Sequence, residues 1–276
     1  MGDLIVPSVH DDLSDLNLTQ ARTISALDDM PVLPPGPPRI AIIVDATSSM
    51  TEHLPSRKIT LEKARADLRP MFEAVSGLQV LVLFFRGDGE FASLGWFANA
   101  EAAAQAIASV EHAPGWTRHD QAFKHLLAEI RKQPIHAALV ISDAVELRGR
   151  GNANGDVWDE LCKDAMRLRR HGCRLSFIYK GTIPNGCPLD RAGPRAEQRI
   201  RELVADNEGT ILNPADSEFT NKLRKVATDA ALRAKGDVDG ARALLPDLRT
   251  IPFSLEAAGD EVLIGRCGSA DGNSSG

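Results

Sequence analysis

The sequence predicts a doubly wound α/β fold, in which a mostly parallel sheet is covered by helices on both faces. Short, continuous apolar runs rich in β-branched residues are typical of strands buried on both sides. They lie at residues 40–44, 78–85, 136–142 and 174–179, with a shorter and weaker run at 210–212. Segments with helical spacing separate these runs, and such alternation requires crossover connections between parallel strands.

Five segments between the strands carry apolar residues three and four positions apart, which is typical of amphipathic helices. They lie at residues 61–75, 122–130, 158–166, 200–204 and 219–230. In the first of them Pro70 is expected to kink or interrupt the helix, because proline removes a backbone donor. Residues 91–97 follow the strand at 78–85 after a Gly-Asp-Gly turn, which predicts one antiparallel strand at the edge of the sheet.

The charge is concentrated in an acidic arm that precedes the predicted sheet domain. Of the 38 acidic and 32 basic residues, six acids and one base lie in residues 1–38, which end in four prolines within five positions. We therefore expect an acidic, proline-rich arm or linker at 1–38 and the sheet domain at 39–235. An extension at 236–267 is apolar enough to pack on the domain or on a partner, and 268–276 reads as a disordered tail.

The overall composition favours a cytoplasmic protein without a nucleic-acid or membrane partner. A net charge of −6 excludes a basic nucleic-acid binder on global charge. No apolar run approaches the roughly 18 residues of a membrane-spanning helix, and the N-terminus lacks a signal-peptide pattern. The four cysteines fit neither paired zinc motifs nor a dense disulfide framework, so we expect reduced thiols.

Oxygen-bearing side chains gather where the predicted strands end. The first strand is followed by Asp45, Thr47 and Ser49 at two-residue steps, and the third by Asp143, while Thr117 precedes a predicted helix. Ligands of open α/β sheets bind outside the carboxyl ends of the strands, so these five side chains would converge if the two strands are neighbours. Hydroxyl and carboxylate oxygens suit Mg²⁺, Mn²⁺ or Ca²⁺.

This three-part pattern resembles the metal-ion-dependent adhesion site of von Willebrand factor A (VWA) domains, which have a Rossmann-like fold, and the resemblance covers roughly residues 39–232. It implies that Thr47 and Ser49 coordinate the cation directly. Asp45 and Asp143 would act directly or through bound water, and Thr117 would join or leave the shell with conformational state.

Residues beside these five positions are expected to form a rim that contacts the partner. Members of the family often have glycine where Ser48 and Ala144 stand here, and a small residue in place of Trp116. Trp116 would narrow the rim or contact the partner directly. Met50 and Arg118 complete the predicted rim.

The resemblance implies a divalent-cation-dependent protein-interaction module and not an enzyme. Mg²⁺ takes about six oxygen ligands, so the predicted shell leaves a position for an Asp or Glu of a protein partner. Bacterial intracellular members of the family often work beside AAA+ ATPases, kinases or phosphatases. By analogy, the chain is expected to be a subunit or regulator of an intracellular complex.

Two other functions remain as alternatives. A strand-terminal Asp45 could be the nucleophile of a phosphohydrolase like the haloacid dehalogenases, although Thr47 stands where that motif has its second acid. A metal-free structural scaffold is the other alternative, because Ser and Thr after a strand often serve as helix caps or turn residues.

Three histidines near Thr117 raise the possibility of a zinc site. They are His112, His119 and His125. His119 and His125 lie six residues apart and do not share a helix face as an i, i+4 pair does. Solvated or hydrogen-bonded histidines are therefore favoured over zinc ligands.

Overall fold

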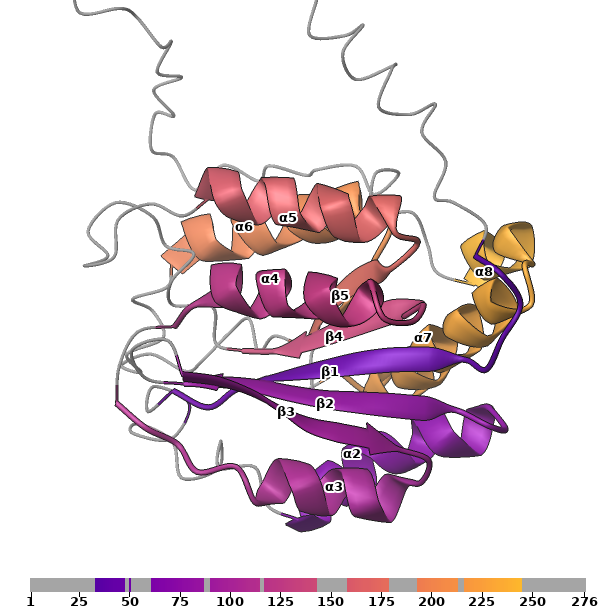
Figure 1. Cartoon of the computed structure of the whole chain (residues 1–276), viewed down its shortest axis with the longest axis horizontal. Helices are drawn as coiled ribbons and strands as arrows, with labels where there is room; N and C mark the ends of the chain where they lie inside the picture. The colour runs from indigo at the N-terminus through magenta and orange to yellow at the C-terminus, as the bar shows by residue number, and fades with distance from the viewer. Residues whose placement is uncertain are drawn as a thin grey trace, which may run out of the picture.

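The computed structural model describes residues 33–47, 50, 61–86, 90–114, 117–142, 158–178, 193–212 and 216–244. Within these ranges one sheet has the spatial order β3-β2-β1-β4-β5-β6 (Figure 1). Its strands are β1 (Arg39–Asp45), β2 (Gln79–Arg86), β3 (Glu90–Phe97), β4 (Ala137–Ile141), β5 (Arg174–Ile178) and β6 (Ile211–Leu212). Every neighbouring pair is parallel except β2 with β3 at the edge, which confirms the predicted sheet.

Helices cover both faces of this sheet (Figure 1). One layer consists of α2 (Leu61–Ala74), α3 (Ala100–Ala108) and α7 (Phe219–Ala234), with α8 (Val238–Leu244) packed against α7. The other layer consists of α4 (His119–Ile130), α5 (Trp158–Arg170) and α6 (Gly193–Asp206). None of the described helices is both long enough and apolar enough to cross a membrane.

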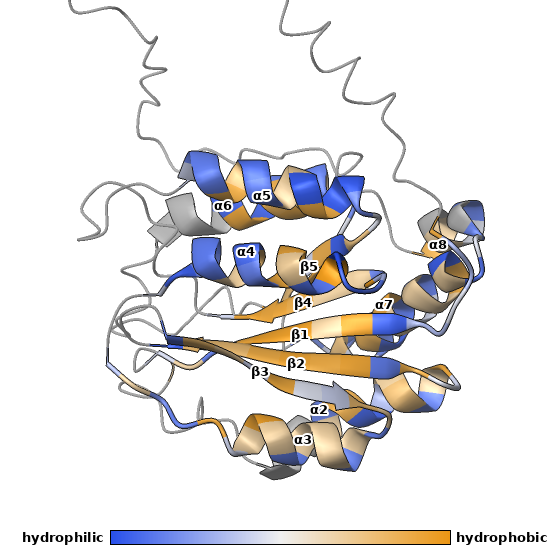
Figure 2. Ribbon diagram, in the orientation of Figure 1, coloured by the Kyte–Doolittle hydropathy of each residue, from blue (hydrophilic) through white to orange (hydrophobic). Residues whose placement is uncertain are grey.

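The sheet separates two apolar cores, and alternate residues of the central strand β1 contribute to each. Ile40, Ile42 and Val44 pack with the layer of α2, α3 and α7, whereas Ala41 and Ile43 pack with the layer of α4, α5 and α6. Figure 2 shows the resulting pattern, with hydrophobic strands between helices whose outer faces are hydrophilic. Burial on both faces explains why the strands are continuous apolar runs.

Two details of the helices differ from the sequence prediction. Helix α3 was not predicted, although Asn99 caps it by accepting the backbone N–H of Ala102 at 2.8 Å. Pro70 does not interrupt α2, which continues to Ala74. The neighbouring Leu68 and Met71 are buried in the core, and this packing stabilises a helix that lacks one backbone hydrogen bond.

The proline-rich linker contacts the sheet domain near the C-terminal end of α7. The backbone N–H of Gly36 donates to the carbonyl of Ala234 at 3.0 Å. Residues 1–32 of the predicted arm and residues 245–276, which hold most of the predicted extension and tail, lie outside the described residues.

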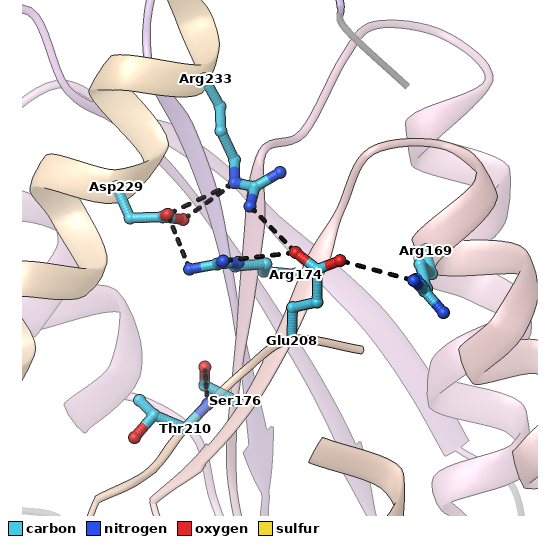
Figure 3. A network of polar contacts seen from close by, with 7 residues as sticks. All are labelled: Arg169, Arg174, Ser176, Glu208, Thr210, Asp229 and Arg233. Atoms are coloured by element: carbon cyan, nitrogen blue, oxygen red, sulfur yellow. Dashed lines mark hydrogen bonds and ion pairs between the residues drawn. The ribbon is translucent and has the colours of Figure 1, made fainter. Parts of the chain in front are cut away.

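A buried network of charges joins α5, β5 and α7 at the amino end of β5 (Figure 3). Asp229 accepts hydrogen bonds from Arg174 at 2.8 Å and from Arg233 at 3.2 Å. Glu208 lies 3.4 Å from both Arg169 and Arg174. Burial raises the pKa of the Asp229 carboxyl, and the guanidinium groups of Arg174 and Arg233 oppose that rise. The network thus keeps two buried guanidinium groups paired.

We predict that Asp229→Ala lowers the free energy of unfolding by about 3–5 kcal/mol, because it leaves buried Arg174 and Arg233 without this carboxylate. Lys225→Ala, at an exposed position on the same helix, should change it by no more than about 0.5 kcal/mol. Urea denaturation of both variants measures the difference. Equal stability of the two variants would show that the network does not stabilise the fold.

His136, at the amino end of β4, is a buried group whose protonation opposes folding. Its Nδ1 accepts the backbone N–H of Arg39 at 3.2 Å, and 1 % of its surface is exposed. Burial, together with the positive charges of Arg39 and Arg233, lowers the pKa of His136 from 6.5 to about 4. Below pH 6.5 the unfolded chain therefore binds a proton that the folded chain does not take up until about pH 4.

We predict that this difference lowers the free energy of unfolding by about 3 kcal/mol as the pH falls from 6.5 to 4. His136→Asn keeps an acceptor for the Arg39 N–H and does not titrate, so its stability should fall less over the same window. Denaturant midpoints measured between pH 4 and 7.5 test this. Parallel curves for the two proteins would contradict the prediction.

Candidate functional site

Asp45 is the last residue of β1, at the carboxyl edge of the sheet. Strand β1 lies between β2 and β4, and the chain leaves β1 toward β2 but leaves β4 toward β5. This is the switch point at which open α/β sheets bind their ligands. Asp45 is completely buried there, so its carboxylate depends on hydrogen bonds from neighbouring groups.

Two segments of the chain donate hydrogen bonds to the Asp45 carboxylate. The backbone N–H and the hydroxyl of Thr47 donate to Oδ1 at 3.0 and 2.6 Å. The hydroxyl of Ser142, the first residue after β4, donates to Oδ2 at 2.6 Å. The carboxylate thus joins the ends of two neighbouring strands across a sequence separation of 97 residues.

These bonds determine where the hydroxyl groups of Thr47 and Ser142 donate and where they can accept. A serine or threonine hydroxyl has one proton and two acceptor lone pairs. Thr47 and Ser142 both direct that proton to Asp45, so each hydroxyl oxygen meets other groups as an acceptor. An oxygen in this state suits a hard cation such as Mg²⁺, so Thr47, the predicted ligand of the two, fits the ion chemically.

A buried histidine supports Ser142 from the other side. His119, the first residue of α4, places Nε2 3.0 Å from Ser142 Oγ and is 1 % exposed. Because the Ser142 proton goes to Asp45, Nε2 must be the donor in this contact. The imidazole lies 5.3 Å from the ring of Phe85 and 6.1 Å from that of Phe177, measured between centroids.

The loop before α4 also runs beside the turn after β1. Ala113 donates its backbone N–H to the carbonyl of Ala46 at 3.0 Å, and Thr47 and Ala113 form an isolated parallel bridge. Thr117 lies four residues further along this loop and is buried, with 7 % of its surface exposed. The structure thus places Asp45 and Thr47 in direct contact and brings the segment that carries Thr117 alongside them.

The other predicted cation ligands and most of the rim lie outside the described residues. Ser49 and Asp143 belong to this group, so the complete five-residue site remains a prediction. The same holds for three predicted rim residues, Ser48, Trp116 and Ala144.

The two described rim residues differ in exposure. Met50 is buried, with 7 % of its surface exposed, and therefore presents little surface to a partner. Arg118 is partly exposed, with 30 % of its side chain accessible, and holds both oxygens of Asp120 at 2.8 Å. Burial raises the pKa of Asp120, but the hydrogen bonds and charge of Arg118 outweigh it and keep the pKa below its usual value. A guanidinium group therefore stands at the N-cap position of α4.

Sequence reasoning did not identify Ser142 or His119 as parts of this constellation. The sequence does hint at a site role for Ser142, because this hydroxyl residue stands between an apolar strand and an acid. His119 was considered only as a zinc ligand, and the favoured reading of a hydrogen-bonded histidine fits its contact with Ser142. In the part of the chain that the structure describes, no three His, Cys, Asp or Glu side chains form a metal-binding group.

The sequence matches no protein-family model and no curated protein. Among solved structures, it is similar to the conserved hypothetical protein BatB from Bacteroides thetaiotaomicron, with 19% identity and a TM-score of 0.51 over 71% of this chain and 98% of that chain. A von Willebrand factor type A protein from Catenulispora acidiphila has 13% identity and a TM-score of 0.49, over 71% of this chain and 43% of that one. The pilus adhesin SpaC from Lactobacillus rhamnosus GG has 12% identity and a TM-score of 0.48, and the match covers 77% of this chain and 31% of that one. The likeness to BatB establishes the shared fold, and at this identity it extends to the fold alone.

Proposed function

We propose that this chain is a divalent-cation-dependent protein-interaction module. In this proposal Asp45, Thr47, Ser49, Thr117 and Asp143 hold Mg²⁺, or Mn²⁺ or Ca²⁺, and a protein partner supplies an Asp or Glu. The observation that carries the proposal is the hydrogen-bond direction at Asp45, which makes acceptors of two hydroxyl oxygens at the switch point of the sheet. The bound ion would supply an open coordination position for the carboxylate of the partner.

The charged residues at the start of α4 do not oppose the approach of an acidic partner. Asp120 is the acid in the first turn of this helix, and Arg118 neutralises it through two hydrogen bonds. The ion pair carries no net charge, so Asp120 would not repel a partner carboxylate at the rim. The attraction for that carboxylate would come from the bound cation itself.

The phosphohydrolase alternative has less support from the geometry around Asp45. The nucleophile in such an enzyme needs an accessible oxygen and a second acid two residues later. Asp45 has no exposed surface, and the residue two positions later is Thr47, which donates its hydroxyl proton to the same carboxylate. In this proposal Asp45 thus orients hydroxyl oxygens and helps to hold the cation, and it does not attack a substrate.

We predict that saturating Mg²⁺ raises the melting temperature of the wild type. An ion at 100 times its dissociation constant stabilises the folded state by about 2.7 kcal/mol, or roughly 5–10 °C for a domain of this size. Thr47→Val removes one acceptor hydroxyl at the site, so its Mg²⁺-dependent shift should be much smaller. Thermal unfolding with and without Mg²⁺ provides the measurement.

Thr210→Val is the matched control for this experiment. Thr210 is also buried, and it lies next to Ser176 in the region of the charge network (Figure 3). It directly precedes β6, which β4 and β5 separate from β1 and Asp45. Its Mg²⁺ shift should equal that of the wild type. If the wild type shows no shift, or if Thr47→Val keeps the full shift, the cation site is refuted.

We further predict that partner capture depends on both the ion and Thr47. The wild type should retain a protein from a cell lysate in Mg²⁺, and the same protein should be lost in EDTA or on Thr47→Val. Quantitative mass spectrometry compares the proteins that the wild type and Thr47→Val each capture, with Mg²⁺ and with EDTA. Capture that survives both chelation and the substitution would instead favour the metal-free scaffold.

A further inference from the structure

We propose that His119 is a positioning residue for the cation site and acts through Ser142. By donating its Nε2 proton to Ser142, His119 fixes the position of the hydroxyl that holds Asp45. This inference rests on the proposed function, because it assigns a role in cation binding to a side chain outside the predicted ligand set.

The geometric basis is a continuous line of hydrogen bonds that joins three elements. His119 begins α4, Ser142 follows β4, and Asp45 ends β1. The contact from Nε2 to Ser142 Oγ is 3.0 Å, and that from Ser142 Oγ to Asp45 Oδ2 is 2.6 Å. Ser142 is the link in this line, since it accepts from one neighbour and donates to the other.

The imidazole is held firmly enough to act as a fixed donor. It is 1 % exposed and lies near Phe85, at the end of β2, and Phe177 of β5. Its position is therefore set by residues from two strands besides β1 and β4. In such a buried place, solvent does not readily replace a lost donor, and an unmade hydrogen bond costs about 1–3 kcal/mol.

His119 affects Asp45 through the two hydrogen bonds of the Ser142 hydroxyl, which accepts from Nε2–H and donates to Oδ2. While Nε2 occupies an acceptor site of Ser142, the hydroxyl proton points to Asp45 Oδ2. Without Nε2–H, Ser142 Oγ loses a contact that fixes its position, so the hydroxyl that donates to Oδ2 is placed less firmly. The opposite oxygen remains tied to Thr47, so the carboxylate is loosened on its Oδ2 side only.

Outer residues that orient a metal-binding group typically change the metal affinity by 10–100-fold when they are replaced. We therefore expect His119→Phe to weaken Mn²⁺ binding to the full chain by about 10–100-fold. His119→Gln should recover most of the affinity, since its amide N–H can replace Nε2–H toward Ser142. The free Mn²⁺ signal in electron paramagnetic resonance measures the dissociation constant directly.

A double-mutant cycle tests whether His119 changes the Mn²⁺ affinity through Ser142 or by a general loss of packing. Ser142→Ala alone should weaken Mn²⁺ binding by about the same factor as His119→Phe, and the double variant should bind no more weakly than either. Phe123→Leu is the control for packing, because Phe123 is a buried residue of the same helix that belongs to the apolar core. It should lower the melting temperature without changing the Mn²⁺ affinity.

The outcomes distinguish this inference from the proposed function. If the wild type binds no Mn²⁺, the proposed function fails and the inference fails with it. If the wild type binds Mn²⁺ and His119→Phe binds it equally well, only the role of His119 is refuted. The same conclusion follows if the affinity losses of His119→Phe and Ser142→Ala add up in the double variant. If His119→Phe does not fold, His119→Asn replaces it with the same expected loss, because its amide is too short to reach Ser142.

Discussion

The constraint on which the site depends is a carboxylate buried at the end of the central strand. Asp45 has no exposed surface, and an ionised carboxylate in that position costs several kcal/mol unless hydrogen bonds or charges compensate it. The compensation comes from Thr47 in the turn after β1 and from Ser142 after β4. It requires that β1 and β4 end at the same level of the sheet, and their parallel register from Ile40 with Ala137 to Val44 with Ile141 provides this.

The two ends of the sheet satisfy buried charge in different ways. At the amino end of β5, Arg174 and Arg233 are paired with Asp229, and this closed network ties α7 to the sheet (Figure 3). At the carboxyl end of β1, the Asp45 carboxylate accepts hydrogen bonds from the neutral donors of Thr47 and Ser142. The first arrangement ties α7 to the sheet, and the second orients the hydroxyl groups on which the proposed cation site depends.

The apolar runs predicted the strands well because both faces of this sheet are buried, so each strand is hydrophobic along its whole length. Helix α3 was missed because it is built mostly from alanine, whose small side chains give little contrast between its two faces. The effect of Pro70 was overestimated because its neighbours Leu68 and Met71 hold α2 against the core. In α2 tertiary packing outweighed the local signal of the proline, whereas the alanines and the Asn99 cap of α3 favour a helix without giving it an apolar stripe.

By itself, the sequence determined the class of fold and the pair Asp45 and Thr47, because strand burial and a two-residue spacing are local properties. The tertiary structure alone decided that Ser142 donates to Asp45 and that His119 hydrogen-bonds to Ser142. The first of these contacts spans 97 residues and the second 23, and both arise from the order of the strands. No pattern along the chain encodes such a contact, because its geometry is set only when β1 and β4 pair and the first residue of α4 reaches Ser142.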